Sequence, residues 1–256
     1  MSVRVERPDD HVAEIVMDRP EALNAVDTRQ AAAIAGTCDQ LAADRGIRVV
    51  ILSSAVAKAF CVGADLKERN ALSDDDLAAQ RPVSRRAYNS VLELPMPTIA
   101  AVEGYALGGG CELALSCDLI IASDTAVFAL PEVGVGVIPG GGGTQLLSRR
   151  VGLNRAADLI FTTRRVGADE AYAIGLADRR APTGGAAQSA RELARQIATK
   201  SPVGLRNAKL ALRTGFDLPL PQGLDVEDRA WRDTAFSADR AEGVAAFVQK
   251  REPQWP

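Results

Sequence analysis

The spacing of apolar and polar residues changes several times along this chain, and each spacing predicts a different element. Strict alternation on both sides of the Pro-Asp-Asp turn at residues 8–10 predicts a β-hairpin, and short apolar runs between turns are typical of buried strands. The elements predicted in the first part of the chain are strands at residues 3–6, 12–17, 47–52, 98–102, 118–122 and 126–130, and helices at about 27–43 and from 73 to the Pro95-Met96-Pro97 stretch. This order predicts an α/β fold.

After Val151 the strand patterns become rare and helical spacing dominates. Helices are predicted at 154–161, 168–174, 186–198, 201–212, 220–236 and 239–250, with a short apolar turn or strand near 176–178. We therefore expect two regions, an α/β core at residues 1–199 and an all-helical region at 200–256. The helical region carries more apolar side chains than a small unit needs inside, so either the core or a partner subunit would cover them.

Composition narrows the class of protein. The 256 residues are 47% hydrophobic, which is ample for a substantial core. The formal net charge of −3 is spread along the chain, so we expect a small-molecule partner and neither nucleic acid nor an acidic membrane. The chain has no apolar run of the roughly 18 residues that cross a bilayer, no secretory signal at residues 1–6 and no CxxC pair. We expect a cytoplasmic protein.

The residues available for catalysis are limited. The single histidine, His11, follows the Pro-Asp-Asp turn and is predicted to be a loop residue. The four cysteines and this histidine form no zinc-binding pattern, so we expect no metal site. Acid–base chemistry is then left to carboxylates.

Residues 104–115 read GYALGGGCELAL, with three glycines directly before an apolar helical pattern. A helix N-terminus presents unpaired N–H groups with partial positive charge, and Glu112 would project from the same face as the Gly109 N–H. An anion-binding site and a tightly packed structural turn both explain this stretch. A second glycine-rich loop occupies 134–144, and neither loop has the spacing of a dinucleotide-binding fingerprint.

Several motifs together resemble the enoyl-coenzyme A hydratase/isomerase (crotonase) family, over nearly the whole chain. They are RPEALNA at 19–25, AFCVGADLK at 59–67, the stretch at 104–115, Pro131-Glu132, IPGGGGTQ at 138–145 and EGVAAF at 242–247. The resemblance implies a crotonase-like spiral of ββα units holding an acyl-CoA site in residues 1–199. It also implies that the helices of 200–256 drive trimer formation, as a homotrimer or as a hexamer built from two trimers.

The resemblance further implies a thioester substrate and assigns residues to it. The N–H groups of Ala64 and Gly109 would form an oxyanion hole, which is the chemistry expected where enolate charge develops. Coenzyme A, as part of the substrate and with no separate cofactor, would lie along Glu21, Ala22, Leu23, Val62 and Lys67, with Phe247 and Lys250 of a neighbouring subunit near its adenine. Relatives often carry a basic residue at the position of Glu21.

Glu112 and Glu132 fall on the two positions that hydratases of this family use. Adding water to a 2-enoyl thioester needs a base for the water and an acid for the α carbon. By resemblance Glu112 is the base and Glu132 the acid, with the Gly140 N–H helping to hold the water, although two close carboxylates share protons. The resemblance therefore implies an enoyl-CoA hydratase, a hydro-lyase that converts trans-2-enoyl-CoA reversibly into 3-hydroxyacyl-CoA.

Three alternatives stay open. DLKER at 65–69 and PVGLRNAKL at 202–210 are similar to 3-methylglutaconyl-CoA hydratases, which act on a branched dicarboxylic acyl group. A 3-enoyl-CoA isomerase needs only one acid–base residue, and this chain offers two. Some methylglutaconyl-type relatives bind RNA through a lysine-rich helix, but residues 77–92 carry three arginines and no lysine. The remaining alternative is a non-enzymatic protein of the same fold that binds RNA or acts as a scaffold.

Overall fold

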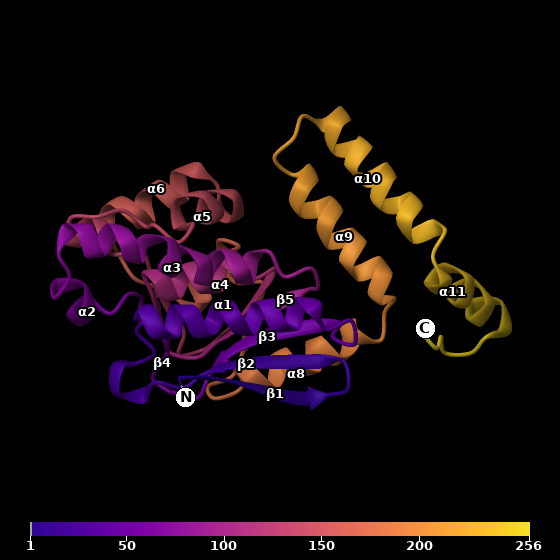
Figure 1. Ribbon diagram of the computed structural model, residues 1–256, viewed down its shortest axis with the longest axis horizontal. Coiled ribbons are helices and arrows are strands. Elements are labelled where there is room, and N and C mark those ends of the chain that lie inside the picture. Colours follow the sequence, from indigo (N-terminus) through magenta and orange to yellow (C-terminus); the bar gives the residue numbers. More distant parts are fainter. Residues whose placement is uncertain (1) are drawn as a thin grey trace.

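A computed structural model describes residues 2–256 as a mixed α/β body with a group of C-terminal helices beside it (Figure 1). One sheet has six strands in the order β1-β2-β3-β5-β7-β10, and the other has four in the order β4-β6-β8-β9. The strands are β1 (Val3–Asp9), β2 (Val12–Met17), β3 (Val49–Ser54), β4 (Ala59–Cys61), β5 (Thr98–Val102), β6 (Tyr105–Leu107), β7 (Leu119–Ser123), β8 (Val127–Ala129), β9 (Val166–Gly167) and β10 (Arg179–Ala181).

Helices cover both sheets and form the C-terminal region. They are α1 (Thr28–Ala43), α2 (Leu66–Asn70), α3 (Asp74–Leu92), α4 (Gly109–Ser116), α5 (Gly143–Val151), α6 (Leu153–Thr162), α7 (Ala168–Ala173), α8 (Ala186–Ala198), α9 (Pro202–Gly215), α10 (Leu220–Ala235) and α11 (Ala238–Gln249), with short 3-10 turns η1 (Pro20–Ala22) and η2 (Glu132–Val135). Among the residues described, no helix combines the length and the apolar character needed to cross a lipid bilayer.

The chain winds between the two sheets in repeated turns. β3, β5 and β7 lie parallel in the larger sheet, and each is followed at once by a strand of the smaller sheet, β4, β6 or β8. Helices complete each turn, α2 and α3 after β4, α4 after β6 and α5 after β8. This confirms the α/β class and the expected spiral of ββα units.

Local sequence signals fix many element boundaries. The N-terminal alternation gives the antiparallel pair β1–β2, with His11 in the turn between them. Asp27 begins α1 by accepting a hydrogen bond from the Gln30 N–H at 2.7 Å, and the Ser73 hydroxyl begins α3 in the same manner from the Asp76 N–H. These elements confirm the predictions made for them.

At the short turn or strand predicted near residues 176–178, the structure has a bend, and a strand follows directly after it. β10 is Arg179–Ala181 and pairs in parallel with β7, while the Asp178 carboxylate accepts the Ile120 N–H at 2.7 Å just before it. The side chains of Arg179 and Arg180 are exposed, so this strand has no apolar pattern. β4, β6 and β9 were not predicted, because strands of two or three residues are too short to show a period.

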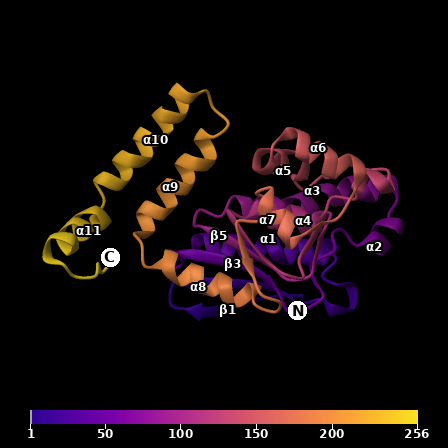
Figure 2. The same cartoon turned by 180° about the vertical axis from the view of Figure 1, so that it is seen from behind.

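The C-terminal helices extend away from the sheets, and both views show α9 and α10 side by side (Figures 1 and 2). Asp118 fastens α9 to the core, because its carboxylate binds Lys209 Nζ at 2.7 Å and Arg213 Nη2 at 2.8 Å. Large apolar side chains of this region remain exposed in the single chain, at Leu212, Phe216, Leu220, Trp231, Phe236, Phe247 and Val248.

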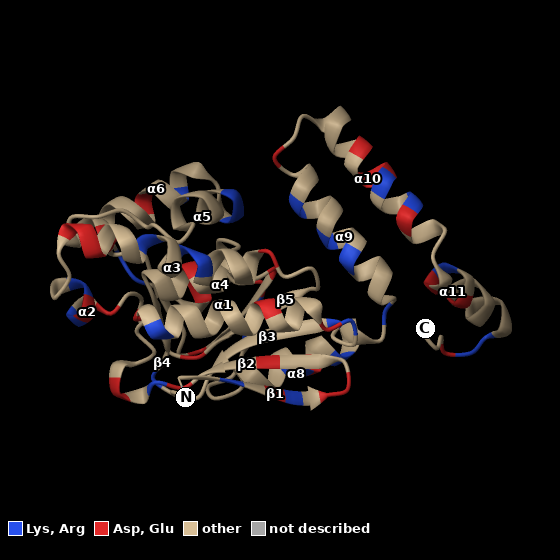
Figure 3. Cartoon of the chain, viewed as in Figure 1, with Lys and Arg blue, Asp and Glu red and all other residues tan. Residues whose placement is uncertain are grey.

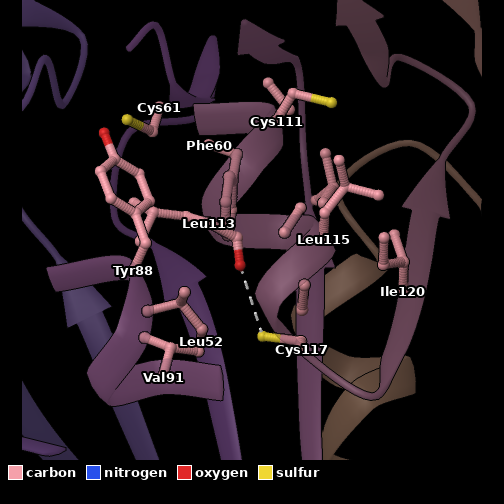
Figure 4. Close-up of a cluster of buried hydrophobic side chains, with 14 of the residues drawn as sticks. Leu52, Phe60, Cys61, Tyr88, Val91, Cys111, Leu113, Leu115, Cys117 and Ile120 are labelled. Carbon is pink, nitrogen blue, oxygen red and sulfur yellow. Dashed lines mark hydrogen bonds between the residues drawn. The ribbon is translucent and has the colours of Figure 1, made fainter. Parts of the chain in front are cut away.

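The core around α4 consists of apolar side chains from both sheets and from α1, α3 and α4. Figure 4 shows Phe60 and Leu113 in this core, together with three cysteines. All four cysteines of the chain are buried and free. This packing places α4, and therefore the glycines at its start, between the two sheets and α3.

Candidate active site

A cavity of about 740 Å³ opens where α3, α4, the loop before α2 and the loop before α5 meet. Glu112 and Glu132 both line it, although they are 20 residues apart in sequence. Of the residues predicted for the site, the wall contains Val62, Ala64, Gly109, Glu112, Glu132 and Gly140. The tertiary structure therefore brings together the carboxylates and the backbone groups that the motifs indicated.

The Ala64 N–H is left free by a short backbone pairing. Val26 pairs with Ala64 as an isolated parallel bridge, in which the Val26 N–H donates to Gly63 O at 2.7 Å and the Asp65 N–H donates to Val26 O at 3.0 Å. In parallel pairing the middle residue directs its own N–H away from the partner. Within residues 2–256 the Ala64 N–H donates to no acceptor, so it is available to a ligand.

The Gly109 N–H faces the same region. α4 begins at Gly109, so this N–H belongs to the first turn and has no partner in the helix. A methyl group on Gly63 would lie 3.1 Å from Gly109 N and 2.9 Å from Leu107 O, and the φ of Gly63 is +98°. Only glycine allows the two backbones to approach this closely.

An ion pair supports the loop that carries Ala64. Arg19 Nη2 donates to Asp65 Oδ2 at 2.8 Å, and Arg19 Nη1 donates to Ala25 O at 2.7 Å. The other carboxylate oxygen of Asp65 caps α2 by accepting the N–H groups of Lys67 and Glu68. The first of the family motifs thus has a structural role here, since its arginine holds the loop in position.

Glu112 is 3% exposed and is held by two backbone donors. Its Oε1 accepts the Gly141 N–H at 2.6 Å and the Gly143 N–H at 2.8 Å. Burial raises the pKa of the Glu112 carboxyl, and these two hydrogen bonds oppose the increase because they stabilise the charged form. Glu112 therefore has a fixed carboxylate orientation.

Glu132, at the start of η2, has a different environment. Its Oε2 is buried and accepts no hydrogen bond from residues 2–256, and its Oε1 lies over Gly108, where an added methyl group would be 2.9 Å away. Burial raises the pKa of the Glu132 carboxyl to about 7, and the negative charge of Glu112 adds to this increase. Near neutral pH this carboxyl can hold a proton or release it.

The raised pKa of Glu132 predicts an effect on stability. The folded-state pKa of about 7 lies above the unfolded value of about 4.3. The contribution of Glu132 to the free energy of unfolding is therefore largest below the unfolded pKa and is lost as the pH rises through about 7. Replacing Glu132 with Gln should remove this loss, so the melting temperature of the variant should fall less than that of wild type between about pH 5 and pH 8. Thermal denaturation at several pH values measures both slopes.

Glu103→Gln is the matched control for this prediction, because Glu103 bonds to Ser123 and Thr125 outside the cavity. Its slope should equal that of wild type. Equal slopes for Glu132→Gln and wild type would contradict the raised pKa.

The loop at residues 139–143 binds Glu112 through its backbone. Gly141 and Gly143 donate their N–H groups to Glu112, and the Gly140 carbonyl accepts Arg81 Nη2 at 2.6 Å. The predicted role of the Gly140 N–H in holding a water molecule stays a prediction. The run of four glycines indicated a site without showing which N–H groups point inward. That choice depends on the turn between Pro139 and α5.

Sequence reasoning also missed Tyr88, whose ring lines the cavity beside Gly109 and Gly141. It occupies a helical position on α3 where a core residue is expected, so no local signal identified it.

The remaining predicted residues lie outside the cavity wall. Glu21, Ala22 and Leu23 belong to η1 and the residue after it, with Glu21 exposed. Lys67 is exposed in the first turn of α2, and the backbone of Leu23 accepts the Val62 N–H at 3.3 Å. Phe247, which is 85% exposed, and Lys250 lie on and just after α11, away from the cavity of their own chain.

The arginines of α3 have partners or face the cavity. Arg86 pairs with Asp39 and Glu93, while Arg81 and Arg85 line the cavity. Figure 3 shows basic and acidic residues on the same helices. The helix therefore does not present a continuous basic surface of the kind that nucleic-acid binding requires.

Comparison with known proteins agrees with the fold and the motifs. The sequence model of the enoyl-CoA hydratase/isomerase family matches residues 7–256. The chain is 40% identical over 250 residues to the probable enoyl-CoA hydratase 2, mitochondrial, of Arabidopsis thaliana, covering 98% of this chain and 83% of that protein. It is 42% identical over 242 residues to the putative enoyl-CoA hydratase/isomerase YngF of Bacillus subtilis, covering 94% and 93%.

Two further similarities are informative. The methylglutaconyl-CoA hydratase, mitochondrial, of Homo sapiens is 41% identical over 221 residues, which are 85% of this chain and 65% of that protein. The crystal structure of the enoyl-CoA hydratase from Bacillus anthracis superposes with a TM-score of 0.97 at 38% identity, covering 100% of this chain and 99% of that one. The fold and site thus define an α/β enzyme of the crotonase type. The chain belongs to the enoyl-CoA hydratase/isomerase family.

Proposed function

We propose that this protein is an enoyl-CoA hydratase, which adds water reversibly and with syn geometry across the double bond of a trans-2-enoyl-CoA to give a 3-hydroxyacyl-CoA. One observation carries the proposal: the buried Glu112 and the half-buried Glu132 line one cavity with the unpaired N–H groups of Ala64 and Gly109. Hydration needs both an acid and a base beside a polarised thioester. An isomerase needs only one proton-transfer group, so the second carboxyl favours the hydratase.

The roles follow from the environments of these groups. The Ala64 and Gly109 N–H groups would bind the thioester oxygen and stabilise the enolate, an effect that can amount to about 3 kcal/mol for each donor. Glu112, fixed by Gly141 and Gly143, would accept a proton from the attacking water, and Glu132 would deliver one to the α carbon. The Gly140 N–H would help to hold the water, and the pair titrates as a unit.

The proposal also covers the binding of coenzyme A and the oligomeric state of the protein. Coenzyme A enters as part of the substrate, so no separate cofactor is needed. Its pantetheine and adenosine parts would follow Glu21, Ala22, Leu23, Val62 and Lys67, and would meet Phe247 and Lys250 of a neighbouring subunit. The exposed apolar side chains of α9, α10 and α11 support a homotrimer or a hexamer of two trimers.

The direct test is hydration of crotonyl-CoA by the purified protein. Hydration removes the conjugated double bond, so the absorbance of the enoyl thioester should fall and 3-hydroxybutyryl-CoA should appear. A panel of chain lengths extends the test to longer acyl groups. Unchanged absorbance with every member of the panel would overturn the proposed function.

A second candidate is a hydratase for branched dicarboxylic acyl groups, such as 3-methylglutaconyl-CoA. The cavity wall contains three arginines, Arg69, Arg81 and Arg85, and no ion pair between these and an acid exists in the part of the chain that the structure describes. Guanidinium groups bind carboxylates well and a hydrocarbon tail poorly. Specificity constants for crotonyl-CoA and 3-methylglutaconyl-CoA, measured for wild type and Arg85→Gln, decide between the two substrates.

A further inference from the structure

Among residues 2–256, Tyr88 is the one aromatic residue that lies beside both glycine loops of the cavity. It projects from α3, is 5% exposed and lines the same cavity as Glu112. Figure 4 shows its hydroxyl end directed away from α3, toward Cys61 and the start of α4. None of the roles proposed above uses this side chain.

The ring spans the distance between the two loops. On one side, a methyl group on Gly141 would lie 2.7 Å from Tyr88 Cγ and 2.8 Å from Cδ1. On the other side, a methyl group on Gly109 would overlap the Tyr88 hydroxyl and lie 3.5 Å from Gly63 Cα. The phenol oxygen therefore lies where the Gly109 backbone and the loop carrying Ala64 approach each other.

The hydroxyl has no partner in the protein. Within residues 2–256 Tyr88 Oη takes part in no hydrogen bond, and the side chain lines the cavity. Burial raises the pKa of the Tyr88 phenol, and the nearby Glu112 carboxylate raises it further, so the group keeps its proton. It is thus a hydrogen-bond donor on the cavity wall that has no acceptor among residues 2–256 and is open to a ligand.

We propose that the Tyr88 hydroxyl donates a third hydrogen bond to the thioester oxygen of the substrate, beside the N–H groups of Ala64 and Gly109. The same ring keeps the Gly109 loop and the Gly141 loop at a fixed separation, and thereby fixes the distance from the oxyanion hole to the Glu112 carboxylate. This inference rests on the proposed function. No bond is made or broken by Tyr88, because it retains its proton throughout.

Tyr88→Phe tests the hydrogen bond while keeping the ring between the two glycines. We expect kcat for crotonyl-CoA to fall roughly ten- to a hundredfold, because an oxyanion donor acts mainly in the transition state, with KM changing by less than about threefold. The melting temperature should stay near that of wild type. Tyr172→Phe, an exposed tyrosine on α7, is the matched control and should leave both constants unchanged.

A spectroscopic measurement separates a hydrogen bond from a packing effect. The absorbance of 4-dimethylaminocinnamoyl-CoA moves to longer wavelength when its thioester oxygen accepts hydrogen bonds. We expect Tyr88→Phe to reduce this shift, and Tyr88→Leu, which also lacks the ring, to lower kcat further. A Tyr88→Phe variant with the wild-type kcat and the wild-type shift would overturn the inference.

The two proposals fail in different ways. If wild type hydrates no enoyl thioester, the proposed function is wrong, and the shift of the bound chromophore still reports whether Tyr88 reaches the thioester oxygen. If wild type is active and Tyr88→Phe is equal to it in rate and spectrum, only the inference about Tyr88 is wrong. If the chromophore does not bind to wild type, the kcat of Tyr88→Phe compared with that of wild type decides the inference.

Discussion

Replacing Glu112 with Gln is expected to lower kcat for crotonyl-CoA hydration by about 10²–10⁴-fold, because an amide cannot accept the proton of the attacking water. The fold should survive the change. The amide oxygen of Gln can still accept the N–H groups of Gly141 and Gly143, which hold Glu112 Oε1 at 2.6 and 2.8 Å. Binding of a non-reactive acyl-CoA should therefore stay within a few-fold of wild type.

The measurement is a steady-state rate together with a calorimetric titration of butyryl-CoA. Glu103→Gln, outside the cavity, serves as the control and should retain full activity. A Glu112→Gln enzyme with more than about a tenth of the wild-type kcat would exclude Glu112 as a proton-transfer residue.

Glu132→Gln is expected to have an effect of similar size for a different reason. The amide keeps the shape of the side chain but cannot transfer a proton to the α carbon, so kcat should again fall by about 10²–10⁴-fold. In the proposed mechanism, hydration requires the protonated form of this carboxyl, the pKa of which burial raises to about 7. The hydration rate should therefore decrease as the pH rises through about 7.

Two experiments test whether Glu112 and Glu132 act together in one reaction step or independently of each other. The pH profile of kcat/KM for wild type should show the high-pH decrease, and the residual activity of Glu132→Gln should lack it. The double variant should be little worse than either single variant, since residues that act as a unit give non-additive losses. Full additivity of the two losses would contradict a shared reaction step.

The motifs allowed much of the site to be predicted, because they place glycines and carboxylates where their local structure can be inferred. The strand before Gly104, the glycine run and the helix carrying Glu112 follow one another in sequence, so the free N–H at the start of α4 was foreseeable. Glu132 directly follows Pro131 after β8, and the motif placed it in the same site.

Other parts of the site depend on contacts between distant segments. The Ala64 N–H is free only because Val26 pairs with the residues on either side of it. Similarly, Gly141 and Gly143 donate to Glu112 across 29 and 31 residues of sequence, and the Gly140 carbonyl is occupied by Arg81. No local pattern specifies which N–H group of a four-glycine run points inward.

By itself, the sequence determined the family, the α/β class, the helical C-terminal region and the two glutamates, since hydrophobic period and motif spacing are local properties of a chain. The tertiary structure decided the rest: the raised pKa of Glu132, the backbone donors of Glu112 and the position of Tyr88 between Gly109 and Gly141. These properties arise from burial and from the close approach of segments far apart in sequence. They exist only once α3, α4 and the loop before α5 pack around one cavity.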